Sequence, residues 1–378
     1  MVKILIAADF VPRARVQCLV EDGKYKDVFS SVLPYISDSD YSVINLEAPI
    51  VVSPSAEPIQ KYGPTLKSSP MAIKVLRDVG FNMVTLANNH FYDYGENGVT
   101  DTLQTCRAEG MDYVGGGLDL KQASNIFYKK IRDYKLAFIN CCENEFSIAE
   151  TGKGGANPIN PVRQYYSIQE AKRNADYVIV IAHGGPENYQ YPTPRMKELY
   201  RYFVDSGADV VVNHHQHCYS GYEIYNGKPI FYGLGNFCFD YANKTKTKWN
   251  DGYMLQLIFD GTDATFNLIP YVQGFDVPGV RLMTDDERRG FHDFISECNR
   301  LIQDDSKLES KYREFCNASS DIYLLSLEPY TNKYLRFARK RGLIPSLLNK
   351  ERALMVLDYL MCESHHERFK LSLTKKVK

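Results

Sequence analysis

Residues 83–98, MVTLANNHFYDYGENG, decide the fold class of this chain of 378 residues. The apolar run from Met83 to Ala87 is typical of a buried strand. Polar side chains follow it at once, namely Asn88, Asn89, His90 and Asp93. From Glu96 to Glu109 the pattern changes to that of an amphipathic helix, which ends at a glycine. The stretch therefore predicts a strand, a polar cluster and a helix in that order, as in α/β folds.

Apolar runs of the same kind recur on both sides of this stretch and alternate with amphipathic segments. They lie at Val2 to Ala7, Tyr41 to Asn45, Leu136 to Asn140, Tyr177 to Ala182 and Val210 to Asn213. Helices are expected over residues 70–79 and 194–206, since each segment begins with proline and is followed by glycine. After residue 213 the pattern changes to strands, with a hairpin at Asn226-Gly227 and further strands near residues 252–259 and 264–272.

The last hundred residues differ in character, being helical in pattern and rich in Lys, Arg and Glu. We expect a domain boundary near residue 280, which separates a domain of residues 1–280 from an α-helical extension of residues 281–378. Leucines that recur in the extension are candidates for its core: Leu301, Leu308, Leu335, Leu343, Leu347, Leu354 and Leu357. Two long loops, residues 53–64 and 143–161, are expected to be functional because of their length.

Charge and cysteine content narrow the functional classes. The 45 Lys and Arg against 46 Asp and Glu give a net charge of −1, which argues against nucleic acid as a partner. The nine cysteines never form a C-x-x-C pair, so we expect reduced thiols in a cytoplasmic protein. The apolar run before Asp9 is too short for a signal peptide or a membrane span, and no direct membrane insertion is expected.

Potential metal ligands gather where the predicted strands end, at the edge where open α/β sheets place their sites. Histidine is scarce, with eight in the chain, yet five lie in these clusters. His215 and His217 would share a face of an extended backbone, as would Asn45 and Glu47. Imidazole, carboxylate and amide groups without thiolates suit one or two divalent metal ions such as Mn, Zn or Fe. The predicted ligands are Asp9, Asn45, Glu47, Asn89, His183, His215 and His217, although Asn45 could equally clip a loop.

One histidine is expected to act rather than to bind metal. His90 follows Asn89 and would point away from it in an extended backbone, and Asp93 could keep the His90 ring protonated. We therefore predict that His90 is the general acid for a leaving group and that Asp93 is its partner. Glu187 and Asn236 are predicted to meet the substrate. Glu187 could instead orient His183, and Asn236 could shape the pocket wall without touching substrate.

Motifs in the first 240 residues resemble those of the CapA family of capsule and poly-γ-glutamate synthesis proteins. They are the segments at residues 44–49, 87–98, 183–187, 207–217 and 230–237, in the order of that family. The resemblance implies a metallophosphoesterase-like fold, an α/β fold with a β-sandwich flanked by helices. It also implies that the predicted ligands fall on metal positions and His90 on the catalytic histidine. The Asp-x-His pair of phosphoesterases is Asp9-Phe10-Val11 here, and Asn45-Leu46-Glu47 replaces their Gly-Asp-x-x-Asp.

These observations lead to two hypotheses of different classes. The first is a metal-dependent hydrolase that activates water against a phosphoester or a γ-glutamyl amide in capsule, poly-γ-glutamate or exopolysaccharide synthesis. Its expected partners are a polymer or phosphoester substrate and the capsule or polymer synthesis machinery. The second is a non-catalytic accessory protein that uses the same pocket to hold a capsule precursor or to assist a polymerase.

Overall fold

The computed structural model describes residues 1–241, 245–261, 263–330 and 332–377. Contacts divide the chain into two compact units, Met1–Glu309 and Ser310–Lys378. The first unit holds two large β-sheets and the helices that cover them, and the second is helical.

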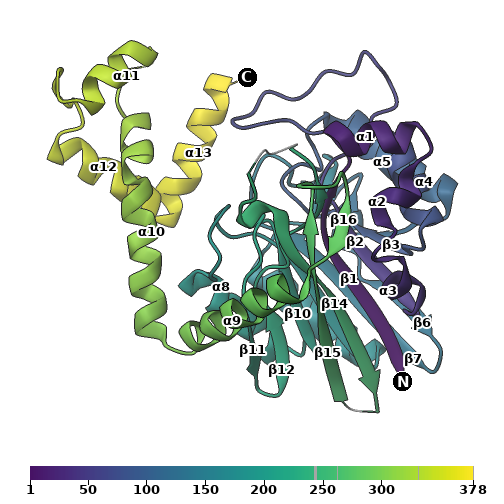
Figure 1. The fold of residues 1–378 in the computed structure, drawn as a ribbon. Helices are drawn as coiled ribbons and strands as arrows, with labels where there is room; N and C mark the ends of the chain where they lie inside the picture. Colours follow the sequence, from purple (N-terminus) through teal and green to yellow (C-terminus); the bar gives the residue numbers. More distant parts are fainter. Residues whose placement is uncertain (242–244, 262, 331, 378) are drawn as a thin grey trace. The chain divides into compact units, whose positions relative to one another are not determined.

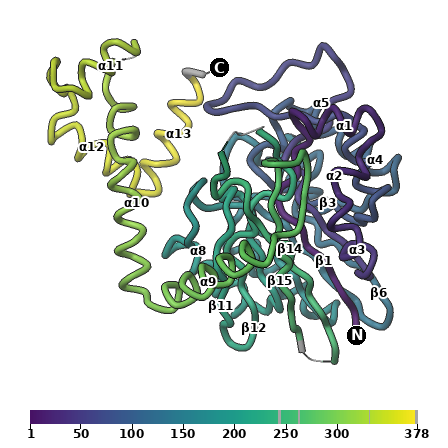
Figure 2. Tube along the Cα trace, viewed as in Figure 1, coloured from purple at the N-terminus to yellow at the C-terminus, as the bar shows by residue number. Residues whose placement is uncertain are grey.

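The first sheet is built around the N-terminal strand. Its order is β16 (Val280–Leu282), β15 (Asp263–Gln273), β14 (Asp251–Asp260), β1 (Val2–Val11), β2 (Tyr41–Leu46), β3 (Met83–Thr85) and β4 (Asp112–Val114), and β13 (Asn236–Phe239) pairs with the end of β1. Strands β1 to β4 run parallel, whereas β14 is antiparallel to β1. Figures 1 and 2 show β1 and β14 side by side although they are far apart in the sequence.

The second sheet has a parallel centre and antiparallel edges. Its order is β11 (Tyr222–Tyr225), β12 (Lys228–Phe231), β10 (Val210–His214), β9 (Tyr177–His183), β7 (Tyr134–Cys142) and β6 (Phe127–Ile131). The β11–β12 hairpin turns at Asn226 and Gly227, whose φ angles of 49° and 74° are those of the predicted Asn-Gly turn. A small sheet pairs β5 (Gly116–Gly117) with β8 (Gly155–Ala156).

The core lies between the two sheets and under the helices. Ile179 of β9 packs in one apolar cluster with Ile6 of β1. Its neighbour Val180 packs in another with Ile168 of α7 (Pro161–Asn174) and Phe203 of α8 (Pro194–Asp205). Because neighbouring strand residues point to opposite faces, one face of the second sheet meets the first sheet and the other meets helices. The predicted α/β fold with a sandwich flanked by helices is confirmed.

The remaining helices of the first unit are α1 (Ala14–Glu21), α2 (Tyr25–Phe29), α3 (Leu33–Ser37), α4 (Met71–Asp78), α5 (Gly95–Glu109), α6 (Leu120–Ala123), the 3-10 helix η1 (Lys248–Asn250) and α9 (Asp285–Ile302). Figure 1 shows α1, α2, α4 and α5 together beside the first sheet. The predicted helices are present as α4, α5 and α8. Helix α5 ends at Gly110, which adopts φ 64°, and the side chain of Thr193 caps α8 by accepting a hydrogen bond from the Met196 N–H.

Helix α9 is part of the first unit although it lies beyond residue 280. Reciprocal hydrogen bonds between Thr284 and Glu287 form a capping box at its start. It buries the apolar side chains Phe291, Ile295, Cys298 and Ile302. The expected domain boundary near residue 280 stays a prediction, and the compact division of the chain lies between Glu309 and Ser310.

The second unit exposes its apolar side chains. Helix α10 (Asp305–Ser326) leads into α11 (Lys333–Lys340), α12 (Lys350–Met361) and α13 (Glu363–Val377). Among residues 310–330 and 332–375, no apolar side chain is buried. The predicted leucine core is therefore wrong for five residues that are 46–71% exposed, namely Leu335, Leu343, Leu347, Leu354 and Leu357. Leucine spacing indicated the helices correctly, but it does not show what covers their apolar side.

The second unit is also basic, with 14 Lys and Arg against 7 Asp and Glu in residues 310–378. The net charge of −1 for the whole chain therefore hides a basic unit and an acidic remainder. The net charge of the whole chain therefore does not exclude an anionic partner for this unit. Within the described part of the chain, none of the helices combines the length and the apolar character needed to cross a membrane.

Candidate metal centre

The predicted site residues come from the carboxyl ends of strands in both sheets. Asp9 lies near the end of β1, opposite Asn45 of β2 and opposite Asn236 of β13. Glu47 follows β2, and His183 is the last residue of β9 in the other sheet. Because the two sheets face each other, their carboxyl ends bring these side chains into one buried cluster.

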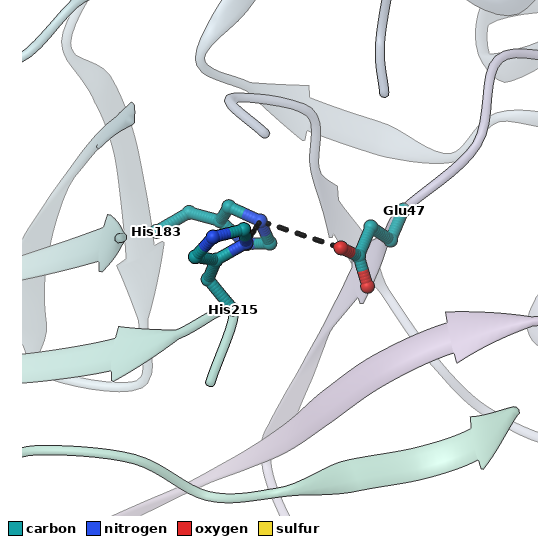
Figure 3. Close-up of side chains that lie close together, drawn as sticks. All are labelled: Glu47, His183 and His215. Carbon is teal, nitrogen blue, oxygen red and sulfur yellow. Dashed lines mark hydrogen bonds and ion pairs between the residues drawn. The ribbon is translucent and has the colours of Figure 1, made fainter. Parts of the chain in front are cut away.

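Glu47, His183 and His215 form the first group of potential ligands, whose ligand atoms lie within 4.8 Å of one another. Figure 3 shows the three side chains converging. The Nε2 atom of His183 lies 3.1 Å from Nδ1 of His215 and 3.4 Å from Oε1 of Glu47. The Oδ1 atom of Asn89 lies 3.1 Å from the same Nε2. One nitrogen donor and two oxygen donors thus lie within 3.4 Å of His183 Nε2, and together with it they form a mixed set that divalent transition metals accept.

Asp9, Glu47 and His217 form a second group with the same spacing limit. Nδ1 of His217 lies 3.7 Å from Oδ2 of Asp9, and Nε2 lies 3.8 Å from Oε1 of Glu47. The carboxylate of Asp9 also accepts hydrogen bonds from Asn45 Nδ2 at 2.8 Å and from the His215 backbone N–H at 3.3 Å. Glu47 is common to both groups, which suits a carboxylate that bridges two ions.

The described residues compensate the two buried carboxylates unequally, because Asp9 accepts two hydrogen bonds and Glu47 accepts none. Neither carboxylate oxygen of Glu47 has a hydrogen-bond partner among the described residues, and the side chain is fully buried. Burial, followed by the charge of Asp9, raises the pKa of Glu47 well above its usual value. Burial also raises the pKa of Asp9 to about 7, against the opposing effect of its hydrogen bonds from Asn45 and His215. A divalent cation would compensate both groups, because burying a charge without a partner is strongly unfavourable.

The histidines of the two groups are neutral at pH 7. Burial lowers the pKa of His215 to about 3 and that of His217 to about 4. Burial and the neighbouring histidines lower the pKa of His183 well below its usual value. A neutral imidazole offers a lone pair to a metal without first losing a proton. The histidines can therefore bind a cation without losing a proton, and the Glu47 carboxylate has no hydrogen-bond donor among the described residues, so this set of residues fits a divalent ion.

The backbone that carries His215 and His217 is not extended, contrary to the sequence-based argument for their shared face. Strand β10 ends at His214, and His215 and His217 adopt φ angles of 95° and 55°. Such left-handed conformations are uncommon for residues other than glycine and occur at functional sites. The two rings reach the same centre because the chain turns sharply, and sequence alternation alone could not predict that turn.

Three further polar residues support the centre. Asn45 donates to Asp9, and its Oδ1 accepts from Thr85 Oγ1 at 3.1 Å, so its side chain links β1, β2 and β3. Its predicted role as a ligand stays a prediction. Asn236 accepts a hydrogen bond from Nδ1 of His217 at 2.9 Å and donates to the His217 carbonyl at 3.1 Å, so it orients this ring. Both ring nitrogens of buried His214 lack a hydrogen-bond partner among the described residues, and Nδ1 lies 3.6 Å from Asp9 Oδ1.

His90 lies beside the two ligand groups and has partners of its own. Its Nδ1 atom lies 2.7 Å from Oδ2 of Asp93, as the sequence predicted for this pair. The segment is a turn rather than an extended strand, and the His90 backbone N–H donates to Asn88 Oδ1 at 3.1 Å. Because Asp93 engages Nδ1, the other ring nitrogen, Nε2, is the one that could meet a leaving group.

Sequence reasoning missed Lys61, which completes this cluster. Its ammonium group forms an ion pair with Oδ1 of Asp93 and lies 3.3 Å from Nδ1 of His90. The side chain is only 4% exposed. Lys61 lies in the loop of residues 53–64, whose length had marked it as functional. The pairing itself had no signal in the sequence, because only the folded loop brings Lys61 to Asp93.

Glu187 is the exposed member of the predicted site. Its carboxylate shares a group with His215 and His217, whose ligand atoms lie within 4.8 Å of one another. Glu187 and Asn236 both lie near histidines of the centre. Their predicted contact with substrate stays a prediction.

Comparison with known proteins identifies the relatives of this chain. Residues 3–241 match the family model described as "Bacterial capsule synthesis protein PGA_cap". The chain is 33% identical over 252 residues to the "Capsule biosynthesis protein CapA" of Bacillus anthracis, a match that covers 64% of this chain and 60% of the relative. It is 35% identical over 229 residues to the "PGA biosynthesis protein CapA" of Bacillus subtilis, covering 60% of each. The chain thus spans about 60% of the length of these curated relatives.

More distant matches extend this set. The chain is 29% identical over 217 residues to a Mycobacterium tuberculosis protein described as "Probable polyglutamine synthesis accessory protein", covering 54% of this chain and 56% of the relative. A crystal structure of a hypothetical protein from Thermus thermophilus superimposes with a TM-score of 0.46 and 15% identity, covering 71% of this chain and 98% of that chain.

Proposed function

The chain belongs to the bacterial capsule synthesis family PGA_cap, and from this premise we propose that it is a metal-dependent hydrolase of capsule or poly-γ-glutamate synthesis. Relatives named for capsule and PGA biosynthesis support the process. The two groups of potential ligands support the metal-dependent chemistry. The nine free cysteines support a reducing, cytoplasmic location.

The observation that carries the proposal is the environment of Glu47. This carboxylate is fully buried without a hydrogen-bond partner among the described residues, yet it belongs to both ligand groups. A protein that needed Glu47 only for structure would supply donors to its oxygens, because an unpartnered buried carboxylate is destabilising. A cation-binding role explains both the missing donors and the surrounding neutral histidines.

The roles of the individual residues follow from their places. The proposed ligands are Asp9, Glu47, Asn89, His183, His215 and His217, and they would hold one or two divalent ions. Bound ions would supply Lewis acidity and a water of lowered pKa. His90 would give a proton to the leaving group through Nε2, while Asp93 fixes its ring through Nδ1. Lys61 holds Asp93 in place, and Asn236 orients His217.

The proposed substrate is a phosphoester or a γ-glutamyl amide in a polymer or its precursor, and the synthesis machinery is the proposed partner. An accessory role without catalysis is the second candidate. One observation favours it, namely the Mycobacterium tuberculosis relatives described as accessory proteins. Val11 also stands where phosphoesterases carry the histidine of their Asp-x-His pair, and it packs in an apolar cluster with Ala48, Leu66 and Phe239.

The test combines metal content with turnover. Full-length protein purified without chelators is analysed for bound metals, and protein loaded with Mn, Zn or Fe is assayed with nitrophenyl phosphate and a γ-glutamyl anilide. We expect one or two ions per chain and hydrolysis of one substrate class. Protein that binds ions but turns over neither substrate would support the accessory role, and protein that binds no divalent ion would refute the metal-dependent hydrolase.

A further inference from the structure

Glu187 differs from the other carboxylates of the centre in its exposure. Asp9 and Glu47 are fully buried, whereas Glu187 is exposed. Its carboxylate lies near His215 of the first ligand group and near His217 of the second. Glu187 is therefore an exposed carboxylate close to one histidine of each group, whereas Glu47 is a buried carboxylate that belongs to both groups.

The loop that carries Glu187 is fastened to the segment that carries the histidines. The backbone N–H of Asn188 donates to the carbonyl of Gln216 at 2.8 Å. In return, Nε2 of the Gln216 side chain donates to the Tyr189 carbonyl at 2.8 Å. Gln216 stands between His215 and His217 in the sequence, so these bonds hold the residues that follow Glu187 against the segment that carries both rings.

We propose that Glu187 is a metal ligand that closes the centre from the solvent side. The inference rests on the proposed function and deepens it. Ligand atoms that bind one ion at about 2.1 Å each are at most about 4.2 Å apart. The three ligand atoms lie within 4.8 Å, so a shift of well under about 1 Å brings them into range.

The charge and the exposure of Glu187 suit a ligand that water or substrate can displace. Glu187 is a third carboxylate, and with Asp9 and Glu47 it reduces the positive charge that two divalent ions would leave in the site. It is also the one carboxylate of the three groups that solvent reaches. Glu187 is therefore the ligand that incoming water or substrate would displace, whereas Asp9 and Glu47 stay in place.

Glu145 provides a matched control. Like Glu187, it is exposed, and its charge likewise raises the pKa of Glu47. Among the described residues it belongs to none of the three ligand groups. Glu187→Gln and Glu145→Gln thus remove the same charge near the centre, but only the first removes a proposed ligand.

The experiment is a calorimetric titration of Mn²⁺, and separately of Zn²⁺, into full-length metal-free wild type, Glu187→Gln, Glu187→Asp and Glu145→Gln. We expect Glu187→Gln to weaken the binding of at least one ion about tenfold or more, Glu187→Asp to weaken it less, and Glu145→Gln to stay within about twofold of wild type. Mn²⁺ electron paramagnetic resonance of the wild type and Glu187→Gln should differ, because the ligand set differs.

Two results would overturn the assignment while leaving the proposed function intact. The first is unchanged affinity and an unchanged Mn²⁺ spectrum in Glu187→Gln, which would leave Glu187 to contact substrate. The second is an equal loss in Glu187→Gln and Glu145→Gln, which would show a general effect of charge. A wild type that binds neither ion refutes the proposed function itself, and the ligand role of Glu187 falls with it.

Discussion

The Nε2 atom of His183 lies 3.1 Å from the Nδ1 atom of His215, just beyond the paired ends of the parallel strands β9 and β10. The pKa values of both residues are lowered, so both rings are neutral at pH 7. One neutral ring can donate its N–H to the other. Both histidines are also candidate ligands of the first group. A metal ion bound by both rings would therefore replace this hydrogen bond.

Removing two imidazoles should abolish metal binding without unfolding the chain. We predict that the double variant His215→Gly and His217→Gly retains less than about a tenth of the wild-type bound metal. Glycine is chosen because both positions have positive φ, where an alanine would be strained. Elemental analysis measures the metal, and circular dichroism confirms the fold. His365→Ala with His366→Ala, in the second unit, is the control, and a double glycine variant with full metal content would contradict the assignment.

His90 should affect turnover but not metal content. Changing His90 to Gln is expected to lower turnover of nitrophenyl phosphate roughly a hundredfold, the usual range for a lost general acid. The loss should be larger for an alkyl ester or an amide, because a poor leaving group depends more on protonation. Steady-state rates and elemental analysis check both points. If the variant loses its metal, His90 is a ligand and the acid must be another residue.

Metal affinity should rise with pH between 5 and 7. Burial raises the pKa of Asp9 to about 7 and that of Glu47 well above its usual value, so in this range the metal-free protein must release at least one proton before binding. Each released proton gives about a tenfold gain in affinity per pH unit. The ligand histidines release none, because their pKa values are lowered. Calorimetric titrations in two buffers of different ionisation enthalpy count the protons, and an affinity that is flat over this range would contradict the prediction.

Lys61→Met should destabilise the fold. The Lys61 side chain is 4% exposed, and its partner Asp93 is fully buried. Removing one partner of a buried ion pair costs about 3 kcal/mol or more, because the other charge stays buried. The control is Lys67→Met, at an exposed position after this loop, where the lost contact with the Tyr94 ring should cost less than about 1 kcal/mol. Urea unfolding gives both values, and equal values would show that the ion pair is not stabilising.

The place of truncation should decide whether the first unit folds. A chain that ends at Glu309 keeps helix α9, whose buried residues include Phe291 and Ile295. A chain that ends at residue 280 loses them, and deleting several core side chains costs about 3 kcal/mol or more for each large one. We expect cooperative thermal unfolding and retained metal for the longer chain alone. Equal stability of the two chains would favour the boundary near residue 280.

Much of the first unit could be predicted from local patterns. Strand β9 is a short continuous apolar run and helix α5 is an amphipathic segment that ends at a glycine, so their positions followed from the sequence. Parallel strands also end at a common edge, which brought Asp9, Glu47 and His183 into one hypothesis. Strand β13 was missed because its pairing with β1 depends on a contact between distant segments.

The remaining parts of the site depend on contacts that no local pattern contains. The ion pair of Lys61 with Asp93 forms only after the loop folds back. The side chain of Asn140 accepts hydrogen bonds from the backbone N–H groups of Leu86 and Ala87, and so holds the turn before Asn89. In the sequence, Asn140 is merely the polar end of an apolar run. Contacts of this kind can be known only from the folded structure, whereas the chemical character of each residue is known from the sequence.

The left-handed backbone at His215 and His217 restricts how this centre could change during evolution. Apart from glycine, the residues that most readily adopt such φ angles are Asn, Asp and His. Valine, isoleucine and threonine are excluded by their branched side chains. Each histidine codon is one nucleotide away from a codon for Asn and from one for Asp, so the substitutions that the backbone tolerates are among those that a single mutation can reach. They would exchange nitrogen for oxygen ligands and move the preference of the centre toward harder ions such as Mg²⁺ or Mn²⁺. The turn that positions the two histidines therefore allows the metal preference of the centre to change during evolution, while the position of the metal site stays the same.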